Sequence, residues 1–151
     1  MKWITREKPK IDRLACPWLI KRFIDKEAEF FYVPKDQVIS EAKNKNAVPY
    51  DVPNVELTHD GELCSFDAFI KKYQLKDKGL EKLAEIVRAA DTDTLEKSQE
   101  SYGLLAITLG LSQNISNDHE LLKVATILYD GLYRWCKDLT GEKHGWYPEK
   151  M

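Results

Sequence analysis

His59 is the strongest single candidate for chemistry in this sequence, because it directly precedes Asp60-Gly61, a dipeptide typical of two-residue hairpin turns. An imidazole at a hairpin tip would face a cleft or solvent, where it could bind a metal ion. A histidine beside a turn is also commonly a plain surface or hydrogen-bonding residue. Side chains of a suitable type to complete a metal site are Asp91, Asp12, Glu7 and His119. Two imidazoles and a carboxylate would suit zinc or iron.

A basic loop lies near the N-terminus, and its cationic residues are Arg6, Lys8, Lys10 and Arg13. Proline is tolerated in the first turn of a helix, where the N–H it lacks has no partner. Pro17 therefore predicts that an amphipathic helix begins near residues 15–17, directly after this loop. Free N–H groups at that helix start, together with Lys8 and Arg13, would form an anion site. The alternative is a set of solvated charges before an ordinary helix.

Two further positions allow a structural or a functional interpretation. Arg88 and Asp91 are three residues apart on an expected helix, so they can form an ion pair across one face. Cys16 lies beside the expected helix start, which would favour its thiolate, although its apolar neighbours favour burial equally well. The sequence contains no GxSxG, Walker, GxGxxG or HExxH motif. The signatures of the common hydrolases, nucleotide-binding proteins and zincins are therefore absent.

The composition indicates a globular protein, with 151 residues, 32% charged residues and 43% hydrophobic residues. We expect a single domain over residues 1–151. The net charge of −2 gives no general attraction to nucleic acid or anionic lipid. No apolar run approaches the length of about 18 residues that a membrane span needs, and no signal peptide is recognisable. Three isolated cysteines, Cys16, Cys64 and Cys136, fit a reducing compartment, so a cytoplasmic location is expected.

The hydrophobic periodicity predicts an α+β fold that is predominantly helical, with helices packed on a small sheet that includes a β-hairpin near residues 55–64. The expected strands are 2–5, 29–33 and an edge segment at 47–52. The expected helices are 36–45, one from Ser65 onward, 79–90, 102–111, and one from a cap at Asn117 to about residue 139. Residues 102–111 are apolar on nearly every side, which predicts a central, buried helix.

The sequence also resembles a known family. The runs TREKPKIDRLACPWLIKRFID, PYDVPNVELTHDGELCSFDAFIKKY, LEKLAEIVRAADT and LYDGLYRWC are similar to the C-terminal domain of the ChrB-type chromate-resistance family, over residues 3–137. The positions that match its polar motif residues are Arg6, Lys8, Asp12, Arg13, Trp18, Arg22, His59, Asp60, Cys64, Arg88 and Asp91. The resemblance implies a cytoplasmic protein of chromate-resistance operons, in which family members are described as chromate-responsive regulators.

Regulators of this family carry an additional N-terminal half, whereas this sequence starts at the resembling domain. We therefore expect a stand-alone module of the chromate stress response. We do not expect this chain alone to bind nucleic acid directly. The first hypothesis is recognition of chromate or a similar oxyanion, because arginine, lysine and free N–H groups complement a tetrahedral dianion. Its expected ligand-binding residues are Arg6, Lys8, Arg13, Arg22 and Arg88.

The second hypothesis is a metal-dependent enzyme acting in chromate detoxification. Its expected metal-site residues are His59, Asp91, Asp12 and Glu7, holding Zn²⁺ or Fe²⁺, with Glu7 or Asp12 as the acid/base. A third possibility is an interaction module whose tail, with Trp146 and Tyr147, binds a partner or a second copy in a homo-oligomer.

Overall fold

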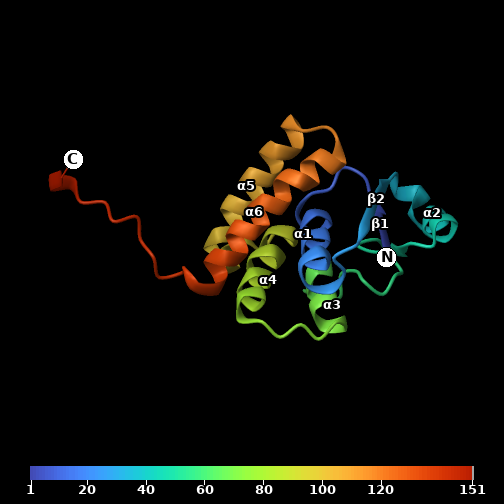
Figure 1. Ribbon diagram of the computed structural model, residues 1–151, viewed down its shortest axis with the longest axis horizontal. Coiled ribbons are helices and arrows are strands. Elements are labelled where there is room, and N and C mark those ends of the chain that lie inside the picture. Colours follow the sequence, from blue (N-terminus) through green and yellow to red (C-terminus); the bar gives the residue numbers. More distant parts are fainter. Residues whose placement is uncertain (151) are drawn as a thin grey trace.

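The computed structural model describes residues 1–150, in which six α-helices pack with one small sheet (Figure 1). The strands are β1 (Lys2–Arg6), β2 (Glu29–Val33) and β3 (Val48–Pro49). The α-helices are α1 (Ile11–Leu19), α2 (Val38–Lys45), α3 (Ser65–Lys72), α4 (Lys78–Asp91), α5 (Gln99–Asn114) and α6 (Asp118–Asp138). A π-helical turn spans Ile20–Ile24, and 3-10 turns span Lys35–Gln37, Leu95–Lys97 and Pro148–Lys150. The predicted class, α+β and predominantly helical, is confirmed.

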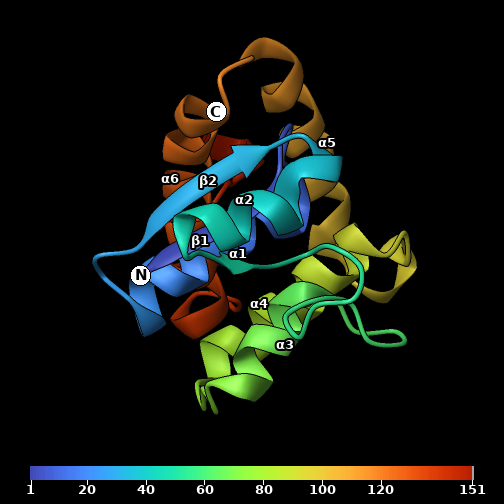
Figure 2. The ribbon, with the colours of Figure 1, turned by 90° about the vertical axis from the view of Figure 1, so that its right-hand side faces the viewer.

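The sheet has the order β2-β1-β3, with both pairs of strands parallel. Successive side chains of β1 point to opposite faces. Trp3 packs into the main core with Phe69 of α3, whereas Ile4 packs against Val38 and Ala42 of α2. The sheet therefore lies between α2 on one side and the helical body on the other (Figure 2). The strands predicted at 2–5 and 29–33 are both confirmed.

The predicted β-hairpin at 55–64 is wrong, although the turn at its centre is confirmed. Asp60 and Leu63 exchange both backbone hydrogen bonds at 3.0 Å, but they form an isolated bridge and no flanking strand. Asp51 has a positive φ of 53°, and its N–H donates to the carbonyl of Leu57 at 2.8 Å. The chain thus folds back after β3 as a loop, which buries Leu57 instead of pairing with the sheet.

The helix expected to begin near residues 15–17 begins at Ile11, so Pro17 lies inside α1. Proline has no N–H to donate to the carbonyl four residues earlier, which is that of Arg13. The hydroxyl of Tyr32, on β2, donates to that carbonyl at 2.8 Å instead. A tertiary contact therefore supplies the hydrogen bond that the prediction assumed to be lost. Because Cys16 lies within this helix and is buried, the helix N-terminus predicted beside it does not exist.

The helical half is organised around α4, which contacts α3, α5 and α6 and buries Leu83, Ile86 and Val87 completely. The side chain of Asn117 caps α6 by accepting a hydrogen bond from the N–H of Glu120 at 3.0 Å, as predicted. Within residues 1–150, no helix combines the length and the apolar character needed to cross a bilayer.

The helix predicted to be central and buried, α5, lies on the surface. Its buried residues are only Ser101, Leu104 and Thr108. Because its apolar residues are spread around the whole helix, periodicity gives no direction for burial. Contact with α4 decides which face is covered, and the opposite face remains exposed (Figure 1).

Replacing Tyr32 by phenylalanine should lower the free energy of unfolding by about 1–2 kcal/mol, because the carbonyl of Arg13 would lose its partner inside the protein. Urea unfolding measures this change. Tyr73→Phe is the matched control, since that ring is likewise part of an aromatic pair, with Phe69, while its hydroxyl makes no hydrogen bond within the described residues. Equal unfolding free energies for Tyr32→Phe and the wild type would contradict this account of Pro17.

Candidate functional site

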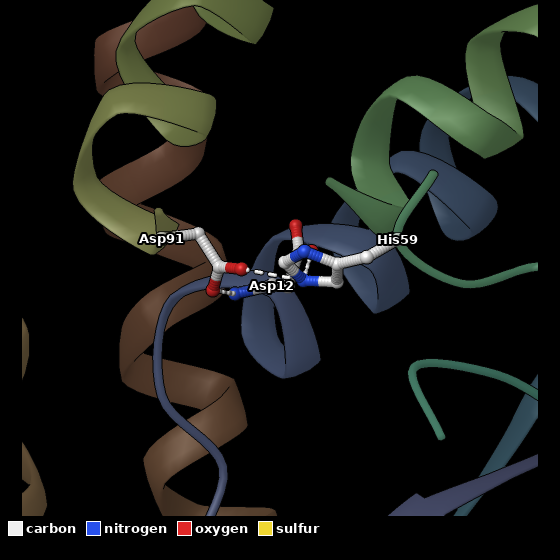
Figure 3. A group of neighbouring side chains, drawn as sticks. All are labelled: Asp12, His59 and Asp91. Carbon is white, nitrogen blue, oxygen red and sulfur yellow. Dashed lines mark hydrogen bonds and ion pairs between the residues drawn. The ribbon is translucent and has the colours of Figure 1, made fainter. Parts of the chain in front are cut away.

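Three residues far apart in the sequence, Asp12, His59 and Asp91, meet at one point (Figure 3). One ligand atom from each lies within 4.8 Å of the other two. Nε2 of His59 is 2.8 Å from Oδ2 of Asp91 and 3.4 Å from Oδ2 of Asp12. A cation bound among these three side chains would be reached by an imidazole nitrogen and two carboxylates, which are common ligands of transition metals.

Two helix N-termini hold the carboxylates of this cluster in place. Asp12, in the first turn of α1, accepts hydrogen bonds from the N–H groups of Ser65 at 2.7 Å and Phe66 at 3.3 Å, at the start of α3. Asp91, the last residue of α4, accepts one from the N–H of Asp12 at 3.3 Å, at the start of α1. Because a helix N-terminus carries free N–H groups and partial positive charge, it stabilises a carboxylate even when that carboxylate is buried.

A third carboxylate, Asp51, lies beside the cluster and was missed by sequence reasoning. Its Oδ1 is 3.4 Å from Nε2 of His59 and accepts a hydrogen bond from the hydroxyl of Ser65 at 2.6 Å. Its Oδ2 faces the guanidinium groups of Arg13 at 3.5 Å and Arg6 at 3.7 Å. The one available signal was its place two residues after a short strand, because the carboxyl ends of the parallel strands β1 and β3 bring Arg6 and Asp51 to the same edge.

Burial and mutual repulsion change the protonation of the cluster. Burial, followed by the charges of Asp12 and Asp51, raises the pKa of Asp91 to about 7. Burial also raises the pKa of Asp12, although its hydrogen bond with His59 opposes this rise. Hydrogen bonds to Asp12 and Asp51 raise the pKa of His59 to about 10. Without a metal ion, the cluster therefore retains a proton on His59 at neutral pH, and this proton balances part of the carboxylate charge.

Two other predicted metal ligands lie elsewhere. Glu7 is exposed and, with Lys8 and Asp118, lines a separate cleft near the start of α6. The His119 ring packs against Tyr32, with centroids 5.5 Å apart. The cluster thus has one imidazole, whereas the sequence argument considered two.

The five predicted oxyanion-binding residues do not converge on one site. Arg88 forms a two-pronged ion pair with Asp67, at 2.9 and 2.7 Å, and Arg22 forms another with Asp130, at 2.9 and 2.8 Å. The backbone N–H of Lys8 donates to Asp118 at 3.1 Å, and Lys8 lines a separate cleft together with Arg13.

Only Arg6 and Arg13 of the predicted set lie near the cluster, both against Asp51. Arg6 also lines a cleft of about 390 Å³ that His59 borders, together with Lys35, Asn54 and Thr58. The cleft therefore combines two cationic side chains with the imidazole and with the carboxylate of Asp51.

All three cysteines, Cys16, Cys64 and Cys136, are buried. Burial raises the pKa of each thiol, to about 11 for Cys136 and further for Cys16 and Cys64. These thiols stay protonated at neutral pH, so the structure does not support the thiolate considered for Cys16.

The fold and the site define a small α+β protein in which a loop histidine meets the buried carboxylate of Asp12, at the start of α1, and the half-buried carboxylate of Asp91, at the end of α4. The family model described as "ChrB, C-terminal domain" matches residues 3–136. The chain therefore belongs to the ChrB C-terminal domain family, as the sequence predicted. It is 31% identical to Protein ChrB of Cupriavidus metallidurans over 132 residues, which cover 87% of this chain and 39% of that protein. The chain thus spans about two fifths of the length of this relative. No solved structure matches it.

The protonation of His59 should make stability depend on pH when a chelator keeps metal ions away. Its pKa is about 10 in the folded protein against an ordinary value of 6.5. The folded state therefore binds the proton more tightly, so this contribution to stability is complete below 6.5 and is lost as the pH rises through 10. Between pH 8 and 10, above the pKa of about 7 of Asp91, the unfolding free energy should fall.

Chemical denaturation at pH 8, 9 and 10 measures this dependence. His59→Gln should flatten it, while His119→Gln should retain the wild-type slope, because His119 lies outside the cluster. Parallel slopes for wild type and His59→Gln would contradict the assigned protonation.

Proposed function

We propose that this protein acts in chromate resistance in the cytoplasm, and that it binds a divalent metal ion at Asp12, His59 and Asp91. Membership of the ChrB family supports the role in chromate resistance, and three buried thiols without disulfides suit a reducing compartment. The observation that carries the metal site is the convergence of one imidazole nitrogen and two carboxylate oxygens within 4.8 Å. A metal ion would take the place of the proton on His59 and balance the same carboxylates.

The ligand set restricts the choice of metal. One imidazole with two carboxylates suits Zn²⁺ or Fe²⁺, and its carboxylate content also admits Mn²⁺. Asp51 lies next to this set, because its Oδ1 faces the same nitrogen of His59 while its Oδ2 faces Arg6 and Arg13. Asp51 would therefore add negative charge beside the metal ion, and it makes no hydrogen bond to the other nitrogen of the imidazole.

Chromate or a similar oxyanion would bind in the cleft beside the metal ion. Arg6 and Lys35 line this cleft, and His59 lies at its border. Without the metal ion, the carboxylates of Asp12, Asp51 and Asp91 would repel a dianion; with it, the site carries the charge that an oxyanion needs. The proposed oxyanion position is therefore next to Arg6 and away from Lys8, Arg22 and Arg88. The sequence had also suggested these three residues as ligand-binding residues.

The proposed site is compatible with two functions, that of a chromate sensor and that of a metal-dependent enzyme. A sensor releases chromate unchanged, whereas an enzyme consumes it during incubation. The absorbance of chromate in a mixture of metal-loaded protein and a suitable reductant separates the two, when compared with the reductant alone.

Untagged protein should bind Zn²⁺ or Fe²⁺ after stripping and reloading, and His59→Gln should weaken that binding by at least about 100-fold, because an imidazole ligand is lost. Calorimetry and elemental analysis measure affinity and content. His119→Gln is the matched control and should bind as the wild type does. Asp91→Asn should also lose the metal ion, whereas Asp12→Asn is unsuitable because Asp12 also holds the start of α3.

Unchanged metal affinity in both His59→Gln and Asp91→Asn would refute this site. Metal binding should also release a proton, because His59 must lose its proton to coordinate. The affinity should therefore rise between pH 6 and 8.

Chromate should bind the metal-loaded protein more tightly than the stripped protein, as measured by calorimetric titration with sulfate as the competitor. Lys35→Gln and Arg6→Gln should each weaken this binding by about tenfold, the effect of losing about 1.4 kcal/mol of charge-assisted hydrogen bonding. Lys10→Gln is the control, because Lys10 lines a different cleft. Chromate binding that is independent of metal and of Lys35 would contradict the proposed position.

A further inference from the structure

The outward face of α5 is apolar, yet the described chain leaves it exposed. From Ser101 to Asn117 the sequence has no charged residue. In the structure Tyr102 is 54% exposed and Ile107 is 49% exposed. A surface helix normally presents charged or polar residues to water, and a helix that is apolar on all sides is normally covered on all sides. The composition of α5 therefore fits a helix that has a partner on its outer face.

The neighbouring helix α6 extends this apolar surface. Its Ile127 is 74% exposed. Between the two helices runs a groove of about 510 Å³, and its walls include Gly103 and Ile107 of α5 with Ile127 and Gly131 of α6. No atom lies within 4 Å of the position that a Cβ would take on either glycine. Protruding isoleucines and glycines with open space above them thus lie on the same face. Such a face can be complementary to itself, which is what a two-fold interface between identical copies needs.

The charges along α6 are complementary to those of an antiparallel copy. Its exposed stripe runs through Glu120, Val124, Ile127, Gly131 and Arg134, at alternating spacings of four and three residues. This spacing is typical of helices that pack along one another. Glu120 and Arg134 lie seven residues on either side of Ile127, so a two-fold axis at Ile127 places each opposite the other.

These charges remain free to rearrange. Glu120 pairs with Lys123 at 3.2 Å and Arg134 pairs with Asp138 at 2.8 Å, within the same helix. Exposed pairs of this kind contribute little to stability, so exchanging them for pairs between copies costs little.

The face is also large enough for a specific contact. With its 16 residues, α5 is about 24 Å long, and two adjacent helices are about 20 Å wide. Each copy would bury roughly 500 Å², or about 1,000 Å² in total, which reaches the lower limit for a specific interface. A reversible dimer is the expected result.

We propose that the α5–α6 face binds a second copy of this chain, in an antiparallel arrangement about a two-fold axis near Ile127. In the structure α5 and α6 lie side by side (Figure 1), so two copies would form a four-helix layer that covers Ile107 and Ile127. This proposal is independent of the metal site, which lies at the ends of α1 and α4.

Sedimentation equilibrium over a concentration series up to about 1 mM, a range that detects weak dissociation constants, tests the proposal. The wild type should approach twice the chain mass of 17.5 kDa. Ile127→Asp should remain folded, because Ile127 is exposed, and should weaken association by at least tenfold. Ile39→Asp is the matched control on α2, where Ile39 is 47% exposed, and should associate as the wild type does.

A charge exchange tests the antiparallel arrangement. Glu120→Arg and Arg134→Glu should each weaken the dimer, and the double variant should recover most of the wild-type affinity. A wild type that stays monomeric throughout the series overturns the proposal, as does undiminished association of Ile127→Asp. Failure of the double variant to recover affinity overturns the antiparallel arrangement.

Discussion

The hydrogen bonding of the buried Asp12 carboxylate is the interaction on which the rest of the structure depends. Asp12 is 1% exposed, and a buried carboxylate is costly unless hydrogen bonds and opposite charge compensate it. The N–H groups of Ser65 and Phe66 and the imidazole of His59 supply this compensation. Because these partners belong to α3 and to the loop before it, satisfying one charge on α1 fixes the relative positions of three segments. The same contacts aim His59 at Asp91.

Every arginine of this protein forms an ion pair with one of its own carboxylates. Two-pronged pairs join Arg88 to Asp67 and Arg22 to Asp130, and these pairs connect α4 with α3 and the π-helical turn with α6. Such arginines stabilise the packing of their segments and are poorly placed to bind a free anion. The cations nearest the cluster are those that face the cleft beside His59. The proposed oxyanion position is therefore in this cleft and not where basic residues are most numerous in the sequence.

Local sequence signals predicted the elements that depend on local interactions. The aromatic and β-branched run 29–33 forms β2, and Asn117 with Glu120 sets the start of α6, because both signals act within a few residues. Predictions failed where distant residues decide. Tyr32 replaces the hydrogen bond that Pro17 cannot make, so α1 starts earlier than expected. The hairpin at 55–64 fails because Asp51 binds Leu57 and directs the chain away from the sheet.

The sequence by itself determined the family, the α+β class and the residue types available for a site, including Asp12, His59 and Asp91. It could not determine which of these residues meet, because Asp12 and Asp91 are brought together only when α1 packs against α4. Tertiary structure alone added Asp51, through the parallel alignment of β3 with β1, and left Glu7 and His119 outside the cluster. It also left the outer face of α5 exposed. Spacing in a sequence records neighbours within an element, whereas a site made by four segments depends on how those elements pack.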